Sequence, residues 1–313
     1  MRKIFLKLIL FAGLILFYGC QGHSSRGMQD SMNEAHFLLN SRNCTGAMEI
    51  LEEHYTNANA DYLQVYATAF ACFANFSTTR FFSDELTNLD FSNAGFFRSL
   101  AAMDTSGDMT SPTDTDYTNL QRAIDELLYA GGIDNPSTAD RISVFGNETA
   151  INLNLQNFYM IMVQMGRWIA YYGNADATGA KGGGASGNSC IMDYNNATVM
   201  ATIDNPPGST GSCTTTNDGH PDLIASRERQ CQGIVLFNNL IEIANSLNVL
   251  GSINSDLDNL TTFTNTLSNL CGLLPGGAAI CDVRHQIQCE MDPAITDDII
   301  EEFYGGIIER LYI

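Results

Sequence analysis

The segment Asn147–Tyr172, with the sequence NETAINLNLQNFYMIMVQMGRWIAYY, sets the architecture of this chain. Its apolar residues recur on almost every side of the helix that the pattern predicts, which is typical of a helix packed over most of its surface. Polar residues at Gln156, Gln164 and Arg167 argue against a membrane span, because such side chains are costly in lipid. We therefore expect a central core helix around which other elements pack.

Further helical patterns lie on both sides of this segment. They cover residues 30–42, 45–55, 61–76, 81–103 (as two short helices), 116–130, 221–250, 255–274 and 295–312. The last pattern places Ile300, Phe303 and Ile307 on one face and acidic residues that include Glu301 and Glu309 on the other. It predicts a closing helix whose apolar face docks on the body and whose carboxylates face solvent. The fold class is therefore predicted to be all-α, with residues 30–313 as one helical domain.

Residues 173–222 interrupt the helical pattern. They include the glycine-rich sequence KGGGASG at 181–187, the turn Pro206-Pro207-Gly208 and a run rich in Ser and Thr. A stretch of about fifty residues far exceeds an ordinary connection between helices, so we expect a flexible loop insertion. The glycines are not followed by Lys-Ser/Thr, and so they do not form a phosphate-binding loop.

The beginning of the chain has the anatomy of an export signal. Arg2, Lys3 and Lys7 form a basic start, and the apolar run that continues to Phe17 is shorter than a bilayer span. This combination predicts a secretory signal peptide over residues 1–19.

The end of that run reads Leu16-Phe17-Tyr18-Gly19-Cys20. This sequence resembles the lipobox of bacterial lipoproteins, in which a cysteine after a small residue is lipidated and becomes the mature N-terminus. The resemblance implies that Cys20 carries lipid such as palmitate, and Gln21 in place of aspartate favours the outer membrane. The small polar residues 20–29 are expected to form a flexible tether. The alternative is a plain signal peptide whose Cys20 later joins a disulfide.

The composition indicates a globular protein with an acidic surface. The 313 residues are 45% hydrophobic and 16% charged, and 35 acidic residues face 15 basic ones, for a formal net charge of −20. A surface so acidic repels phosphate backbones, which excludes nucleic acid as a partner. Lys181 is the single lysine after the signal region, so positive charge rests almost wholly on arginine.

Cysteine usage agrees with export. Besides Cys20 there are eight cysteines, and an even number in an oxidising compartment favours disulfides: Cys44, Cys72, Cys190, Cys213, Cys231, Cys271, Cys281 and Cys289. Cys44 lies fourteen residues before Ala58 and Cys72 fourteen after it, so an antiparallel hairpin that turns there would place the two cysteines level. We predict a bridge between them, with two buried free cysteines as the alternative. Cys190 and Cys213 are expected to staple the loop insertion.

The run Glu34–Phe76 resembles tetratricopeptide (TPR) units, in which short antiparallel helices alternate small and bulky residues. The resemblance rests on Leu38-Leu39, on Cys44-x-x-Ala47 and on Tyr66-x-x-x-Phe70-Ala71, and it covers about one and a half repeats. It implies stacked antiparallel helical hairpins, an α-α superhelix that presents a concave surface to extended peptides or other proteins.

One cluster has the spacing of metal ligands. Cys281, His285 and Cys289 recur at four-residue intervals and, with Cys271, would make a Cys3His set suited to zinc. In an oxidising compartment the even cysteine count favours two disulfides and a surface histidine instead. We therefore predict no metal at this cluster.

Two acidic stretches invite comparison with calcium loops. Asp104, Asp108, Asp114 and Asp116 lack the regular spacing and the distal glutamate of such a loop, which favours solvated carboxylates. The sequence NDGHPD at 217–222 is predicted to be a turn that enters a helix. The five histidines are scattered and none forms a His-Glu-x-x-His motif, so we predict that the chain is not an enzyme and has no cofactor.

Together these features predict a lipid-anchored helical-repeat protein of the cell envelope, periplasmic or surface-exposed, that acts as a protein-binding or scaffolding module. The alternative is a small-ligand binding component of a periplasmic solute uptake system, with a pore lined by the aromatic residues of 158–172. A through-going apolar cavity would favour the ligand carrier. A groove lined by polar and aromatic side chains would favour the protein-binding module.

Overall fold

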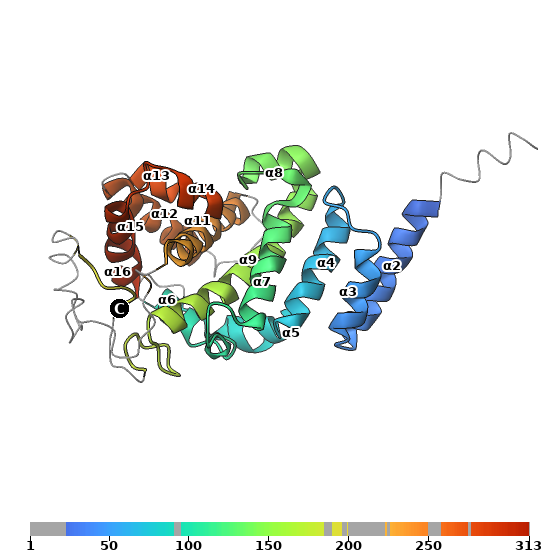
Figure 1. Ribbon diagram of the computed structural model, residues 1–313, viewed down its shortest axis with the longest axis horizontal. Coiled ribbons are helices and arrows are strands. Elements are labelled where there is room, and N and C mark those ends of the chain that lie inside the picture. Colours follow the sequence, from blue (N-terminus) through green and yellow to red (C-terminus); the bar gives the residue numbers. More distant parts are fainter. Residues whose placement is uncertain are drawn as a thin grey trace, which may run out of the picture. The chain divides into compact units, whose positions relative to one another are not determined.

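The computed structural model describes residues 23–90, 95–184, 190–195, 199, 223, 226–249, 258–274 and 277–312. Over these residues the chain forms helices and turns, and no β-strand, which confirms the all-α prediction (Figure 1). The chain divides into two compact units, Met1–Thr56 and Asn57–Ile313, and this division falls inside the predicted helical domain 30–313. The predicted signal peptide and Cys20 lie outside the described residues.

The first unit contains two helices, α2 (His23–Asn40) and α3 (Cys44–Glu52), which pack against each other. The Asn43 side chain caps α3 by accepting a hydrogen bond from the Gly46 N–H at 3.0 Å. Because α2 begins at His23, it takes in most of the segment 20–29 that was predicted as a flexible tether. Gly27 lies against the imidazole of His54, which gives these early helical turns a surface to pack on.

The second unit is built around α9, whose bounds, Asn147–Tyr172, confirm the predicted core helix. Its other elements are α4 (Ala60–Phe73), α5 (Thr78–Arg80), η1 (Phe81–Glu85), η2 (Leu86–Asn88), α6 (Phe96–Ala101), η3 (Ser106–Asp108), α7 (Thr115–Leu128), η4 (Ala130–Gly132), α8 (Thr138–Phe145), α11 (Arg227–Val249), α12 (Asp258–Leu273), α13 (Gly277–Cys281), α14 (Gln286–Met291), α15 (Asp297–Phe303), η6 (Tyr304–Ile308) and α16 (Glu309–Leu311). Within this unit α9 contacts α4, α6, α7, α8 and α11, and Figure 1 shows α7 alongside it.

The aromatic residues of α9 fill the core. Trp168 is fully buried, and its ring stacks on that of Tyr304 with centroids 5.6 Å apart. Gly233 of α11 lies so close to both side chains that a Cβ atom there would be 2.6 Å from the Trp168 ring and 2.6 Å from the Tyr304 hydroxyl, so α11 approaches α9 through a glycine. Phe158 and Tyr172 are also buried, and these rings therefore serve packing.

The polar residues of α9 tie the core to its surroundings. Arg167 is fully buried and donates to three backbone carbonyls: those of Ala74 at 2.8 Å, Thr105 at 3.1 Å and Asp116 at 3.1 Å. These carbonyls belong to three separate segments, so one guanidinium satisfies groups that the packing would otherwise leave unpaired.

The C-terminal elements differ in part from the prediction. Ile300, Phe303 and Ile307 are buried as expected, but Glu301 and Glu309, predicted to face solvent, are only 5% and 3% exposed. The prediction for these two carboxylates was wrong because the loop insertion covers them. Its described residues, 173–184 and 190–195, donate to both carboxylates.

The described part of the loop insertion is held by hydrogen bonds. Gly182 donates to the Gly173 carbonyl at 3.0 Å and Gly184 to that of Asn174 at 2.8 Å, so the start of the glycine-rich sequence forms a bonded turn. Lys181, between them, reaches the carboxylate of Glu309, and its side chain is 13% exposed. The single lysine of the body is therefore nearly buried.

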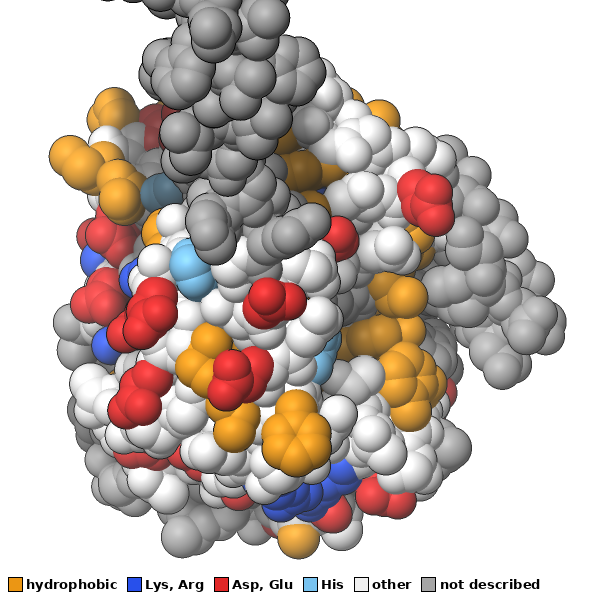
Figure 2. Space-filling view, turned by 90° about the vertical axis from the view of Figure 1, so that its right-hand side faces the viewer, with side chains coloured by type: hydrophobic (Ala, Val, Ile, Leu, Met, Phe, Trp, Pro, Cys, Tyr) orange, Lys and Arg blue, Asp and Glu red, His pale blue; other side chains and the backbone are white. Residues whose placement is uncertain are grey.

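No helix in the described ranges combines the length and the apolar character needed to cross a bilayer. On the face shown in Figure 2, acidic side chains are spread among neutral ones, and basic side chains gather in a few places. This distribution fits the acidic composition.

Candidate functional site

Most of the cysteines predicted to form disulfides do so in the structure. Two bonds join Cys231 to Cys289 and Cys271 to Cys281. Cys44, Cys72 and Cys190 are disulfide-bonded as well, and Cys213 lies outside the described residues. The pairings of Cys44 with Cys72 and of Cys190 with Cys213 stay predictions, as does the TPR-like arrangement of hairpins.

The four residues considered for zinc are used in other ways. All three cysteines of that set are in disulfides, two of them with each other and Cys289 with Cys231. His285 caps α14, because its Nδ1 accepts a hydrogen bond from the Ile287 N–H at 3.2 Å. The described residues hold no cluster of three or more potential metal ligands.

The four aspartates considered for calcium each have a separate partner. Asp104 pairs with Arg80 at 3.1 Å and Asp108 with Arg167 at 3.6 Å. Asp116 accepts from Asn75 at 3.0 Å. The fourth, Asp114, accepts from Thr110 and Ser111 of its own turn, which lowers its pKa. The second acidic motif, 217–222, lies outside the described residues.

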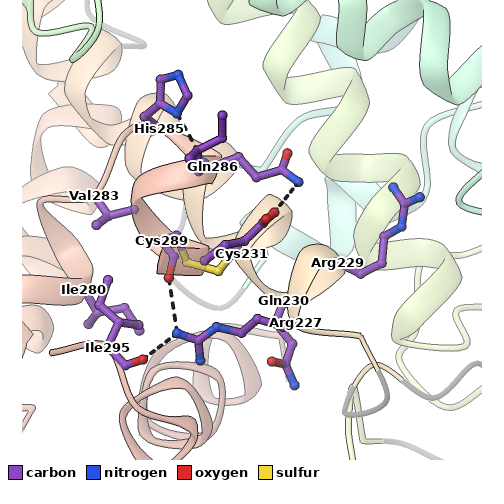
Figure 3. The surroundings of a disulfide bond; sticks show 12 residues. Arg227, Arg229, Gln230, Cys231, Ile280, Val283, His285, Gln286, Cys289 and Ile295 are labelled. Carbon is purple, nitrogen blue, oxygen red and sulfur yellow. Dashed lines mark hydrogen bonds between the residues drawn. A yellow bond between two sulfur atoms is a disulfide. The ribbon is translucent and has the colours of Figure 1, made fainter. Parts of the chain in front are cut away.

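One face of α11 holds the short helix α14 in place. Cys231 forms the disulfide to Cys289, and Arg227, one turn earlier, donates to the backbone carbonyls of Cys289 at 3.2 Å and of Ile295 (Figure 3). Residues four apart share a face of a helix, so the disulfide and the guanidinium act together. Together they fix the position of α14 and the turn that follows this helix.

Two asparagines further along α11 hold the segment that leads into α14. Asn238 donates to the carbonyls of Ile280 at 2.8 Å and Val283 at 2.7 Å. Asn239 donates to that of Arg284 at 3.0 Å. These bonds satisfy carbonyls of an irregular segment and fix the approach to His285.

A groove runs beside this fixed helix, and we call it the α14 groove. Its polar half encloses about 380 Å³ between α7, α11 and α14 and is lined by residues that include Asp125, Tyr129, Glu228, His285 and Glu290. The rings of Tyr129 and His285 meet with centroids 4.7 Å apart. The polar half therefore offers carboxylates and a pair of rings on one wall.

A chain of side-chain amides leads from the core to Asp125. Gln164 of α9 and Gln232 of α11 both donate to the Oε1 atom of Gln121, at 3.3 and 3.4 Å. The amide nitrogen of Gln121 is thereby directed to Asp125, to which it donates at 2.9 Å. Burial raises the pKa of Asp125 to about 7, and the bonds from Gln121 and the charge of Arg122 only partly oppose this effect.

The second half of the α14 groove is apolar. It is a shallow, open hollow of about 500 Å³ and is lined by residues that include Asp134, His285, Ile287, Met291 and Asp292. His285 and Ile287 line both halves, so the two hollows are continuous. Ile287 and Met291 are 60% and 76% exposed, although each is large and apolar.

The charges of the α14 groove have one sign. Five acidic side chains line it, those of Asp125, Asp134, Glu228, Glu290 and Asp292, and no lysine or arginine does so in the part of the chain that the structure describes. Asp125, with its raised pKa, is only partly ionised at neutral pH, and the other four carry the charge. Glu228 is partly neutralised by Arg229 at 3.3 Å. Glu290 accepts an amide hydrogen bond from Gln286 at 2.8 Å. The groove can therefore offer carboxylates to cationic groups and an exposed aliphatic surface to an apolar group.

Sequence reasoning missed this groove. The helical pattern at 221–250 was recognised, but Arg227, Cys231 and Asn238 were not seen to share one face of it. Their spacing of four and seven residues is the signal that would have linked them. The exposed residues Ile287 and Met291 were not recognised as sharing one face, because no helix was predicted over residues 281–294.

Comparison with known proteins found no match among protein-family models, curated proteins or solved structures.

Proposed function

We propose that this chain is a lipid-anchored protein of the bacterial cell envelope that binds another envelope protein through the α14 groove. The proposal combines the lipobox-like end of the signal region at Cys20 with disulfides in the body of the chain. Disulfides persist in oxidising compartments such as the periplasm, which supports export.

The observation that carries the binding role is the exposed pair Ile287 and Met291 beside a groove lined by carboxylates and rings. Large apolar side chains gathered at a hollow mark interaction sites more often than single exposed ones do. The Cys231–Cys289 disulfide and the bonds from Arg227 hold this surface in one shape. A preformed surface loses less entropy on binding, which favours recognition of a partner.

Site-specific photo-crosslinking tests this role in intact cells. A photo-reactive amino acid in place of Met291 is expected to crosslink to one defined protein. The control places the same amino acid at Leu273 of α12, which is 77% exposed and outside the groove. Equal crosslinking patterns at the two positions would contradict the proposal.

The anchor is tested separately. Replacing Cys20 by Ser is expected to move the protein from the membrane fraction to the soluble fraction. Membrane retention of the C20S variant would remove the lipid anchor from the proposal and leave the binding role untouched.

A second candidate, the binding of a small ligand, is supported by another hollow. About 510 Å³ lies between α11, α12 and α13, beside the Cys271–Cys281 disulfide, where Glu242 and Arg284 pair at 3.0 Å. This volume lies in the usual range of small-molecule sites. Native mass spectrometry of protein isolated from the envelope decides this candidate: a small molecule bound at one-to-one stoichiometry supports it, and the mass of the free protein alone counts against it.

A further inference from the structure

The α14 groove joins two kinds of surface in a fixed order. Its polar half lies between α7, α11 and α14, and its apolar half follows beyond His285 toward Met291. A ligand that contacts both halves must be longer than either hollow. An extended peptide meets this requirement, since its backbone carries side chains of different character from one end to the other.

The charge of the groove restricts the sequence of such a peptide. Three exposed or half-buried carboxylates, those of Asp134, Glu290 and Asp292, line it and form no ion pair within the part of the chain that the structure describes. Bringing further negative charge to this surface is unfavourable because like charges repel each other. Lysine or arginine side chains are attracted to the carboxylates, so their binding is favoured.

The apolar half restricts the other end of the peptide. Ile287 and Met291 lie one turn apart on α14, so their side chains share one face and form a continuous aliphatic surface. Covering both removes apolar area from water, and an aliphatic residue of the partner does this best. Methionine is flexible, so this surface accepts aliphatic side chains of different shapes.

We infer that the partner of the α14 groove is an extended protein segment that carries lysine or arginine residues next to aliphatic ones. This inference rests on the proposed function and specifies its partner. The basic residues lie in the polar half against the carboxylates, and the aliphatic residues cover Ile287 and Met291.

The test uses the full chain in detergent and fluorescein-labelled peptides of defined sequence. KRKLIL and its reverse, LILKRK, cover the two possible directions. The charge-reversed EDELIL and the peptide KRKSQS, which lacks aliphatic residues, serve as controls. We measure fluorescence anisotropy and expect one of the first two peptides to bind at least about tenfold more tightly than either control.

Two surface variants then locate the peptide. Replacing Ile287 and Met291 together by Gln removes the aliphatic surface and keeps a residue that favours helix, and we expect binding to weaken about tenfold. Leu273→Gln changes an equally exposed aliphatic residue outside the groove, and there binding is expected to stay unchanged. Circular dichroism melting curves confirm that the variants are folded.

Three results would overturn the inference: EDELIL bound as tightly as KRKLIL and LILKRK, no binding of any basic peptide, or unchanged binding in the I287Q/M291Q variant. If binding is unchanged in the I287Q/M291Q variant and spermidine also displaces the peptide, the groove is a site for small amines. The photo-crosslink from Met291 separates the two proposals, because a crosslinked partner without peptide binding leaves the proposed function standing and removes only this inference.

Discussion

Two groups of carboxylates in the second unit differ in what surrounds them. Glu309 in α16 is 3% exposed, and it receives Lys181, the backbone N–H of Ile191 at 2.7 Å and the hydroxyl of Tyr194 at 2.9 Å. Burial and the Glu309 carboxylate raise the pKa of the Tyr194 hydroxyl well above its usual value, which keeps it protonated as a donor. In the α14 groove, by contrast, Glu290 and Asp292 accept hydrogen bonds from amide groups, and neither forms an ion pair within the described residues.

The difference separates a folding role from a binding role. At Glu309 the chain supplies a cation and two further donors, so this carboxylate is satisfied from within and holds the loop insertion on the C-terminal elements. In the groove the chain supplies no cation through the lining residues that the structure describes, so this charge is available to a partner. The number of acidic residues alone would not distinguish the two groups.

The largest effect is expected at Glu309. Glu309→Gln leaves the ammonium of Lys181 nearly buried without its counter-charge, and breaking a buried pair in this way costs about 3–5 kcal/mol. Urea unfolding measures this loss. The double variant K181M/E309Q removes the unpaired charge and should recover part of the stability. An unchanged unfolding midpoint in E309Q would show that the pair does not hold the fold.

A smaller effect of opposite sign is expected at Asp125. Its pKa is raised from 3.8 to about 7 in the folded state, so ionising it in place costs stability. The cost is absent below the unfolded pKa, grows as pH rises from about 4 to about 7, and is constant above that range. A shift of this size corresponds to about 4 kcal/mol when the group is fully shielded from solvent, and Asp125 is only partly buried. Asp125→Asn keeps the acceptor for Gln121 and should therefore stabilise the protein by about 2 kcal/mol at pH 8.

Thermal or urea unfolding of D125N and the parent chain at several pH values measures this difference. The two chains should have equal stability near pH 3 and diverge toward pH 7. A constant difference over the whole range would show that the substitution acts through packing and that the Asp125 pKa is not the cause.

The exposed carboxylates of the groove, unlike Asp125, should matter little for folding. The double substitution Glu290→Gln and Asp134→Asn removes two charges from the α14 groove and is expected to change the free energy of unfolding by less than about 0.5 kcal/mol. A loss as large as that of E309Q would erase the distinction between the two groups. Urea unfolding of the two variants side by side makes the comparison.

The smallest effect is expected from calcium. Asp104, Asp108, Asp114 and Asp116 each have a separate partner, so calcium should stabilise the protein only by screening, as sodium does. Melting curves at matched ionic strength test this, and a larger shift with calcium would indicate a specific site.

Sequence patterns predicted the helices better than their environment. The bounds of α9 follow from its long apolar run, and the buried face of the C-terminal helix follows from its periodicity. The burial of Glu301 and Glu309 does not follow from either, because the donors that reach them come from residues 181–195, more than a hundred positions away. The π-helical turn η6 just before Glu309 also shifts the helical phase on which the prediction relied.

The candidate site was hidden for a related reason. The groove is assembled from α7, α11 and α14, and the disulfide Cys231–Cys289 and the bonds from Arg227 join the last two. Eight cysteines allow 105 pairings, so this pair was not readable from spacing. The pairing of Cys231 with Cys289 places α14 beside α11 and so determines which residues line the groove.

The most direct test of this account is the affinity of the basic peptide for the E290Q/D134N variant, measured by fluorescence anisotropy beside E49Q/E52Q. The second variant removes the same number of charges from exposed positions of α3, outside the groove. The account predicts that E290Q/D134N binds the peptide at least about fivefold more weakly than the parent chain, and that E49Q/E52Q binds it as the parent does. Equal affinities for the two variants would mean that net charge attracts the peptide, and they would contradict a binding role for the α14 groove.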